Sequence, residues 1–268
     1  MTKFNVAKAL KAGIVAGGVS AILFSASAFG NHTWSTYHWA KSGSSMPLKV
    51  VDSVTADWQF ELDISIDEWN QSSVMNMSID SADDSKKARR RCTMVPGQMR
   101  VCNNSYGRNG WLGLASIGLD SNGHIDQGTA KMNDTYASSW TPDQKRHVMC
   151  QEIGHVFGLN HTSVDGSSQM TCMDYSQDPQ SISPNAHDYQ MLADMYAHAD
   201  SYNSYDDSAA STSGGGNPGG GKPSGRGNAG MDIPRGILVS KSGRSEMWVA
   251  SRADGGYWVH HIYLAEAE

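Results

Sequence analysis

The sequence predicts an α+β domain that carries a small β-rich extension near its C-terminal end. Short stretches of alternating or β-branched apolar residues recur between residues 47 and 133. A helix with clear start signals is expected over about 142–158, and an amphipathic helix over 184–199. After a stretch rich in Gly and Ser, strand-like patterning returns within residues 231–268.

The first 28 residues have the order of a secretory signal. Three lysines (Lys3, Lys8 and Lys11) precede an apolar run, and small residues end it at Ala28. This order predicts a signal peptide over 1–28, with cleavage after Ala28, and therefore a secreted protein, extracellular or periplasmic. An uncleaved membrane anchor is the alternative. No later stretch is apolar over the length that a bilayer requires, so we expect no membrane span after cleavage.

The charge balance argues against polyanionic partners. The formal net charge is −6, and loss of the signal peptide with its lysines makes the remaining chain more acidic. A chain of this charge is not expected to bind nucleic acid or an anionic membrane.

The four cysteines of an exported chain predict two disulfides. Of the possible pairings, we favour Cys92–Cys102, because it closes a short loop, and this leaves Cys150–Cys172. The second bond would join the central helix to the segment that follows it. A cysteine-rich zinc site is the alternative, but the chain has no CxxC pair.

Residues 47–54 and 73–80 predict strands, whereas the stretch between them fits two structures. Alternation favours a strand at Trp58, Phe60, Leu62, Ile64 and Ile66. Helical spacing is kept by Trp58, Leu62, Ile66 and Trp69, with Thr55 as a possible N-cap. We predict a helix over 56–70, which the family resemblance given below also favours.

Two further features precede the central helix. Lys86 to Arg91 contains five basic residues around Ala88 and is interpreted as a solvated loop, with a protease-sensitive maturation site as the alternative. Residues 109–119 and 124–133 predict a hairpin. Its first strand either belongs to a plain core hairpin or pairs with an extended substrate, in which case Gly110 and Gly113 would let a peptide lie close.

The central helix has a recognisable beginning and end. Thr141 is a good N-cap, Pro142 suits the first helical position, and Asp143 lies near the positive end of the helix dipole. Gly158 allows the chain to leave the helix and turn back, because glycine tolerates positive φ.

The spacing of polar residues on this helix indicates a metal site. Gln151 and His155 lie one turn apart on the same face, so both can point at the same ion, and the turn at residue 158 returns His161 to that point. Glu152 follows the first ligand position, where its carboxylate can reach a bound water. His147 lies one turn before Gln151 on the same stripe.

Residues 151–161 read QExxHxxGxxH, and residues 172–175 read CMDY. These motifs resemble those of the metzincin clan of zinc endopeptidases, in style closest to the matrixins. The Met-x-Tyr order of Met173 and Tyr175 is more similar to astacins and serralysins. The chain also looks like a group of exported, mostly bacterial, matrixin-like proteins with a similar QEIGH helix and CMDY turn.

The resemblance covers about 47–199 and implies a metzincin-like catalytic domain within residues 29–200. Such a domain has a twisted mixed sheet, an active-site helix, a Met-turn below the metal and a C-terminal helix. This chain departs from the clan at its first histidine, which is Gln151. Residues 1–91 also contain no cysteine, so latency through a cysteine-bearing propeptide is not expected.

The resemblance implies a Zn²⁺ ion held by Gln151, His155 and His161. Glu152 would act as the general base toward a water molecule, and Tyr175 would donate a hydrogen bond to the developing oxyanion. Met173 would form an apolar floor that packs under the metal without binding it.

The substitution at the first ligand position leaves two alternatives. The amide oxygen of Gln151 is a neutral donor but a weaker one than imidazole nitrogen. We estimate a loss of a few kcal/mol from the roughly 10–16 kcal/mol typical of structural zinc peptides, so binding should survive. His147 would replace Gln151 only if the helix shifted by a turn, which would misplace Glu152. Otherwise His147 is interpreted as a buried polar residue beside the site.

The rest of the chain is interpreted as structural. His187 and His198, on the closing helix, are expected to be surface or cap residues. The composition of 201–230 predicts a flexible linker. Residues 231–268 predict two or three strands that either dock on the main domain or form a processed tail or adhesion element. Alternation puts His260 and His261 on opposite faces, and both are interpreted as structural.

Taken together, these patterns predict a monomeric, secreted, zinc-dependent endopeptidase acting on protein or peptide substrates. One alternative is a catalytically inactive metzincin fold that binds peptides or a partner through its cleft. The other is a surface structural or adhesion protein in which the C-terminal unit is the active part.

Overall fold

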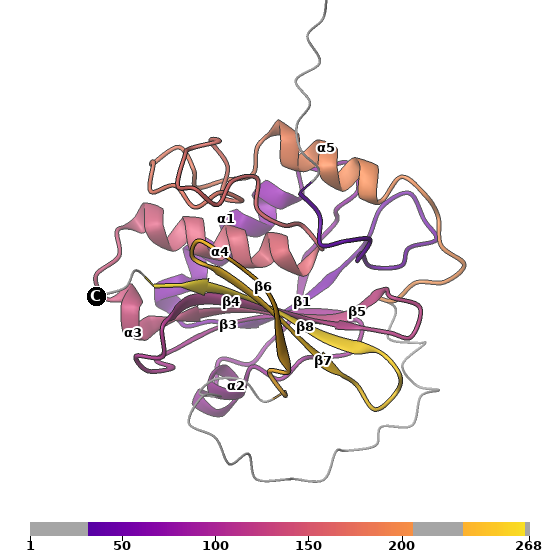
Figure 1. The fold of residues 1–268 in the computed structure, drawn as a ribbon, viewed down its shortest axis with the longest axis horizontal. Coiled ribbons are helices and arrows are strands. Elements are labelled where there is room, and N and C mark those ends of the chain that lie inside the picture. Colours follow the sequence, from indigo (N-terminus) through magenta and orange to yellow (C-terminus); the bar gives the residue numbers. More distant parts are fainter. Residues whose placement is uncertain (1–31, 206–232, 266–268) are drawn as a thin grey trace, which may run out of the picture.

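The computed structural model describes residues 32–205 and 233–265, and the framework of this part is a mixed sheet of eight strands. The strand order is β2-β1-β3-β5-β4-β8-β7-β6 (Figure 1). The strands are β1 (Lys49–Ser53), β2 (Ser78–Ala82), β3 (Gln98–Asn104), β4 (Trp111–Leu119), β5 (Ile125–Asn133), β6 (Ile237–Ser242), β7 (Ser245–Ser251) and β8 (Tyr257–Leu264). The expected mixture of helices and strands is confirmed. The predicted signal peptide and most of the predicted linker lie outside the described residues.

The pairing of the strands changes direction across the sheet. β1 is parallel to β2 and β3, and β3 is parallel to β5. From β5 onward, through β4, β8, β7 and β6, every pairing is antiparallel. β4 is therefore an interior strand, with β5 on one side and β8 on the other.

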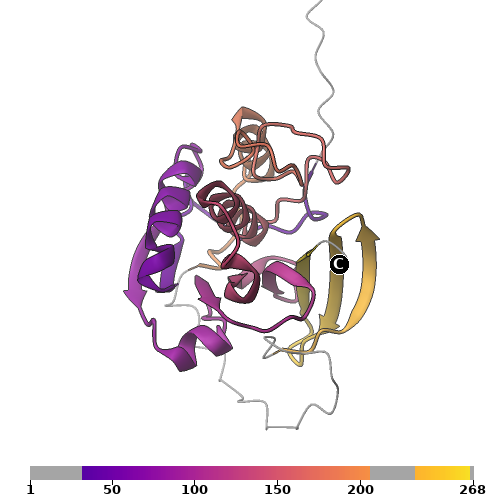
Figure 2. The same ribbon diagram turned by 90° about the vertical axis from the view of Figure 1, so that its left-hand side faces the viewer.

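Helices cover both faces of this sheet. Figure 1 shows α1 (Gln59–Trp69), α4 (Pro142–Val156) and α5 (Ala186–Met195) on one side, with α2 (Lys86–Arg91) on the other, and Figure 2 shows the same layers turned by 90°. A short helix, α3 (Asp134–Ala137), follows β5. Within residues 32–205 and 233–265, no helix combines the length and apolar character needed to cross a membrane.

The ambiguous stretch after β1 is helical, as predicted. A short 3₁₀ turn (Ala56–Trp58) leads into α1, and the side chains of Leu62, Ile66 and Trp69 are buried against the core. Thr55 does not act as the expected cap, because its side chain makes no hydrogen bond to the helix start.

Three short elements differ from the predictions. The basic run expected as a loop is α2, which the Ser85 hydroxyl caps by accepting from the backbone N–H of Ala88. The strand expected over 73–80 begins only at Ser78. β3 was not predicted, because its letters QMRVCNN show little alternation; β1 and β5 hold it in the sheet as parallel partners on both sides.

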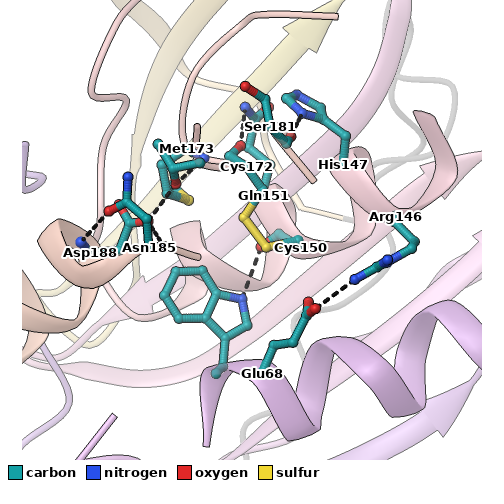
Figure 3. The surroundings of a disulfide bond; sticks show 12 residues. Glu68, Arg146, His147, Cys150, Gln151, Cys172, Met173, Ser181, Asn185 and Asp188 are labelled. Atoms are coloured by element: carbon teal, nitrogen blue, oxygen red, sulfur yellow. Dashed lines mark hydrogen bonds and ion pairs between the residues drawn. A yellow bond between two sulfur atoms is a disulfide. The ribbon is translucent and has the colours of Figure 1, made fainter. Parts of the chain in front are cut away.

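Both favoured disulfides are confirmed. Cys92 is bonded to Cys102, and Cys150 to Cys172. Figure 3 shows the second bond, which ties α4 to the segment containing Met173. The backbone carbonyl of Cys150 also accepts a hydrogen bond from the indole N–H of Trp69, so α1 contacts the same point of α4.

The C-terminal residues form three strands that dock on the main domain, as the first of the two predicted alternatives requires. β8 is hydrogen-bonded along β4, from the pair Trp111 and Leu264 to the pair Leu119 and Tyr257. Away from the centre of the sheet, Arg252 adds an ion pair to Asp126, with 2.8 Å between its Nη1 atom and Oδ1. The extension is thus a continuation of the main sheet.

Removal of the Cys150–Cys172 bond should destabilise the protein. The bond joins residues 22 apart in sequence, so its loss should lower the free energy of unfolding by about 3 kcal/mol. Urea unfolding of Cys150→Ala/Cys172→Ala would measure this. The matched control is Cys92→Ala/Cys102→Ala, which opens a loop of only 10 residues and should cost slightly less. A control variant that loses more stability than the first would contradict this dependence on loop length.

Candidate metal centre

The candidate site is built on α4, whose start is as predicted. The Thr141 hydroxyl accepts from the Gln144 backbone N–H, and the Gln144 side chain accepts from the Thr141 backbone N–H, which completes a capping box. At the other end, Gly158 has φ +95°, and a Cβ atom there would lie 2.1 Å from the Tyr37 carbonyl oxygen. Only glycine fits this turn, which returns His161 toward α4.

His155 and His161 meet at the centre of the site. Their Nε2 atoms are 3.1 Å apart. Nδ1 of His155 lies 2.8 Å from the carbonyl oxygen of Leu159, so this nitrogen carries the proton and Nε2 presents a lone pair. Either a hydrogen bond from His161 or a cation shared by both rings would satisfy the contact between the two Nε2 atoms.

Burial keeps these rings neutral. It lowers the pKa of His155 to about 3 and that of His161 well below its ordinary value. A neutral imidazole is the form that binds metals, so both side chains are ready to act as ligands near neutral pH.

Gln151 is held by the turn that contains Met173. Its Nε2 donates to the carbonyl oxygens of Cys172, at 2.9 Å, and Asp174, at 2.8 Å (Figure 3). Because two acceptors define the amide nitrogen, Oε1 is the remaining atom, and it has no hydrogen-bond partner in the described structure. A fully buried, unpartnered amide oxygen fits a neutral ligand to a cation.

Met173 packs against α4. A Cβ atom on Gly154 of α4 would lie 2.5 Å from the Met173 Sδ atom, so the thioether packs directly against the helix backbone. Tyr175 follows on the same turn, with its ring centroid 4.2 Å from that of His161. Burial raises the pKa of Tyr175 well above its ordinary value and keeps the phenol protonated.

Glu152 is fully buried, and neither carboxylate oxygen has a partner within hydrogen-bonding geometry in the described residues. Burial raises its pKa well above the ordinary value, and an interaction with the Ala115 backbone offsets this only in part. Gly113 makes the room for this side chain, because a Cβ atom there would lie 2.2 Å from Oε1 of Glu152. The space at Gly113, which one of the two alternatives for this strand gave to a peptide, is taken by Glu152.

His261 of β8 is the residue that sequence reasoning missed. Its ring centroid lies 3.9 Å from that of His155 and 4.6 Å from that of His161. Its Nε2 is 2.8 Å from the Ser245 hydroxyl, whereas its Nδ1 has no hydrogen-bond partner in the described structure. One ligand atom from each of His155, His161 and His261 lies within 4.8 Å of the others, so three imidazoles could hold a metal ion.

The alternation of β8 did contain part of this signal. His260 is structural as expected, since its Nδ1 contacts the Ser116 hydroxyl at 2.8 Å and its Nε2 contacts the Pro234 carbonyl oxygen at 3.1 Å. One of the two histidines had to face the helices. Only the register of β8 on β4, which pairs His261 with Ala115, brings that side chain to α4.

His147 lies beside the centre and outside this group of three. Its Nδ1 is 2.5 Å from the carbonyl oxygen of Ser181, and its side chain is buried. This is the geometry of a buried polar residue, the second of the two interpretations given to it.

Two further groups could hold a metal ion. They are His32, His187 and Asp188, and His38, His198 and Asp200. His198 is exposed, as expected, whereas His187 is half-buried in the first turn of α5, where Asn185 is the cap and accepts from the His187 backbone N–H. Sequence reasoning did not anticipate that each would lie beside another histidine and an aspartate.

Comparison of the chain with protein-family models and with curated proteins finds no match. The interpretation of the site therefore depends on its own geometry.

Acid should destabilise the metal-free protein. Below about pH 6.5 the unfolded chain binds protons that the buried His155, His161 and His261 exclude, so stability present at neutral pH is lost as pH falls. Each histidine contributes up to about 1.4 kcal/mol per pH unit to this loss of stability. Glu152 acts in the opposite direction, because its raised pKa lets the folded protein bind one proton at a pH where the unfolded chain does not. Urea unfolding with a chelator from about pH 7 to about pH 4 measures the slope. His155→Gln should flatten it, and an unchanged slope would exclude a buried neutral imidazole at this position.

The contact between Gly113 and Glu152 can be tested by a double-mutant cycle. Gly113→Ala should lower the free energy of unfolding by roughly 2 kcal/mol, because its methyl group overlaps the Glu152 carboxylate. Gly113→Ala/Glu152→Ala should be more stable than the sum of the single changes predicts, since the clash is gone. Additive effects in urea unfolding would show that a methyl group at position 113 does not touch the Glu152 carboxylate.

Proposed function

We propose that this protein is an exported, zinc-dependent endopeptidase and that the structure is its closed form. The observation that carries the proposal is the approach of His155 and His161, whose Nε2 atoms are 3.1 Å apart. Glu152 extends from the same helix, and Met173 packs against that helix from a separate turn. This combination supports the metzincin-like reading of the motifs.

The donor atoms fit a zinc ion. Imidazole nitrogen is a preferred zinc ligand, and the hydrogen bond from His155 to a backbone carbonyl is the kind of support that metal-binding histidines commonly have. The unpartnered Gln151 Oε1 adds a neutral donor and no compensating charge. When bound, zinc would supply Lewis-acid chemistry, polarising a peptide carbonyl and acidifying water.

Glu152 would then move the protons of the reaction. It takes a proton from the attacking water and passes it to the departing amine, which requires an ionised carboxylate at the first step. Burial alone opposes ionisation, whereas a nearby cation and entering solvent favour it. The carboxylate is therefore suited to act as base only in an open, metal-loaded site.

Tyr175 would stabilise the charge that develops on the substrate. Its pKa is raised by burial, so the phenol keeps its proton and can donate a hydrogen bond to an oxyanion. An extended peptide would be recognised through main-chain hydrogen bonds to β4, the strand that also packs on α4. The two disulfides support a protein that works in an oxidising compartment.

A second candidate is a catalytically inactive metal-binding protein. The observation that favours it is burial: Gln151, Glu152 and His155 are fully inaccessible, and His261 is 1 % exposed. Closed sites of this kind are typical of structural zinc, whereas catalytic zinc keeps an open position.

Metal content and peptide cleavage of matched variants separate these candidates. Wild type should lose bound zinc on His155→Ala/His161→Ala and keep it on Glu152→Ala. Cleavage of a mixed peptide library, followed by mass spectrometry, should disappear in both variants, and in Glu152→Ala by at least about 100-fold. Bound zinc together with cleavage that Glu152→Ala leaves unchanged would reject the proposed mechanism, and zinc binding with no cleavage under any condition would favour the inactive protein.

A further inference from the structure

We propose that His261 is the third imidazole ligand of the metal in the closed chain, and that β8 thereby acts as an intramolecular inhibitor. The inference rests on the proposed endopeptidase function, because it concerns how that same site is blocked. It goes beyond that function by assigning a ligand and a regulatory role to the C-terminal strands.

The first observation is that β8 occupies the edge of β4 that a substrate would need. The two strands are antiparallel and paired from Trp111 to Leu119, while β5 covers the other edge of β4. Figure 1 shows β8 alongside β4 at the centre of the sheet. A peptide that binds by adding a strand to β4 cannot do so until β8 leaves.

The second observation is the orientation of the His261 ring. The Ser245 hydroxyl, on the neighbouring strand β7, lies 2.8 Å from Nε2 and can accept a hydrogen bond from it. In that tautomer Nδ1 carries the lone pair, and Nδ1 is the atom left without a hydrogen-bond partner in the described structure. A hydrogen-bonded second nitrogen is what a metal ligand requires, and a buried lone pair without a partner is costly unless a cation or proton meets it.

The third observation is that the same strand covers the proposed oxyanion donor. Tyr263 stacks on Tyr175, with ring centroids 4.7 Å apart, and the Tyr175 hydroxyl lies 3.5 Å from Nε2 of His261. Arg244 lies over the Tyr263 ring, 4.8 Å from its centroid. Arg244 and Tyr263 also line a cavity of about 400 Å³, together with residues of α4 and of the segment 176–182. The C-terminal unit thus blocks the metal, the phenol and the edge of β4 at once.

Metal binding and docking of β8 must then be coupled. If His261 is a ligand, a bound metal stabilises the docked strand, and the docked strand strengthens metal binding by the same factor. His260 provides the matched control, because it lies on the same strand but faces away from the site, toward Ser116 and Pro234.

The experiment uses the full chain and zinc alone. Zinc dissociation constants, measured by competition with a chromophoric chelator, are compared for wild type, His261→Ala, His261→Gln and His260→Ala. Hydrogen exchange of the β8 amides is then measured with and without zinc. His261→Gln keeps most of the side-chain volume, so it remains informative if His261→Ala folds poorly.

Both His261 variants should bind zinc at least about tenfold more weakly, and His260→Ala should stay close to wild type. Zinc should slow exchange of the β8 amides in wild type and in His260→Ala, and leave it unchanged in the His261 variants. If the endopeptidase function is correct, His261→Ala should also cleave the peptide library faster than wild type.

Equal zinc affinity in wild type and the His261 variants, or β8 exchange that does not respond to zinc in wild type, would overturn the inference. The proposed function would survive that result if His155→Ala/His161→Ala still abolished zinc binding. Failure of wild type to bind zinc at all would instead remove the proposed function and, with it, this inference.

Discussion

Convergence of three imidazoles in the buried interior is the constraint on which this structure depends. His155, His161 and His261 come from a helix, a turn and a distant strand, and all three are buried. Burial holds each ring neutral, since a charged imidazole there would lose its hydration. Their lone pairs then need a proton or a cation, and the α4 helix, the turn at Gly158 and β8 are all placed so that the rings meet.

Gln151 makes two hydrogen bonds that a neutral histidine could not make together. Its amide nitrogen donates to both Cys172 and Asp174, and so holds the Met173 turn against α4. A neutral histidine has only one N–H to give. The remaining amide oxygen has no hydrogen-bond partner in the described structure, so it is free of the contacts that connect the helix to the turn.

The C-terminal strands cover one edge of β4. With β5 alone, β4 would present a free edge beside the site, which is a common way to bind an extended peptide. Addition of β8 closes that edge and stacks Tyr263 on Tyr175. The same contacts that complete the eight-stranded sheet therefore enclose the centre of the site.

Local signals in the sequence were sufficient for much of the framework. Short stretches of sequence predicted the cap at Thr141, the turn at Gly158, the helical spacing of Leu62 and Trp69, and both disulfide pairings. They could do so because capping, glycine backbone freedom and loop closure are local effects. The approach of His155 and His161 followed from helical periodicity and one turn.

Only the tertiary structure decided the rest. β3 is a strand because β1 and β5 supply its hydrogen-bond partners, whereas its own sequence shows little strand-like alternation. Which face of β8 meets the helices depends on its register with β4, and a shift of one residue would exchange His260 and His261. The sequence by itself determined the helix, the turn and the approach of their two histidines. The pairing of distant strands decided that His261 joins them, because strand register is set by non-local hydrogen bonds and burial.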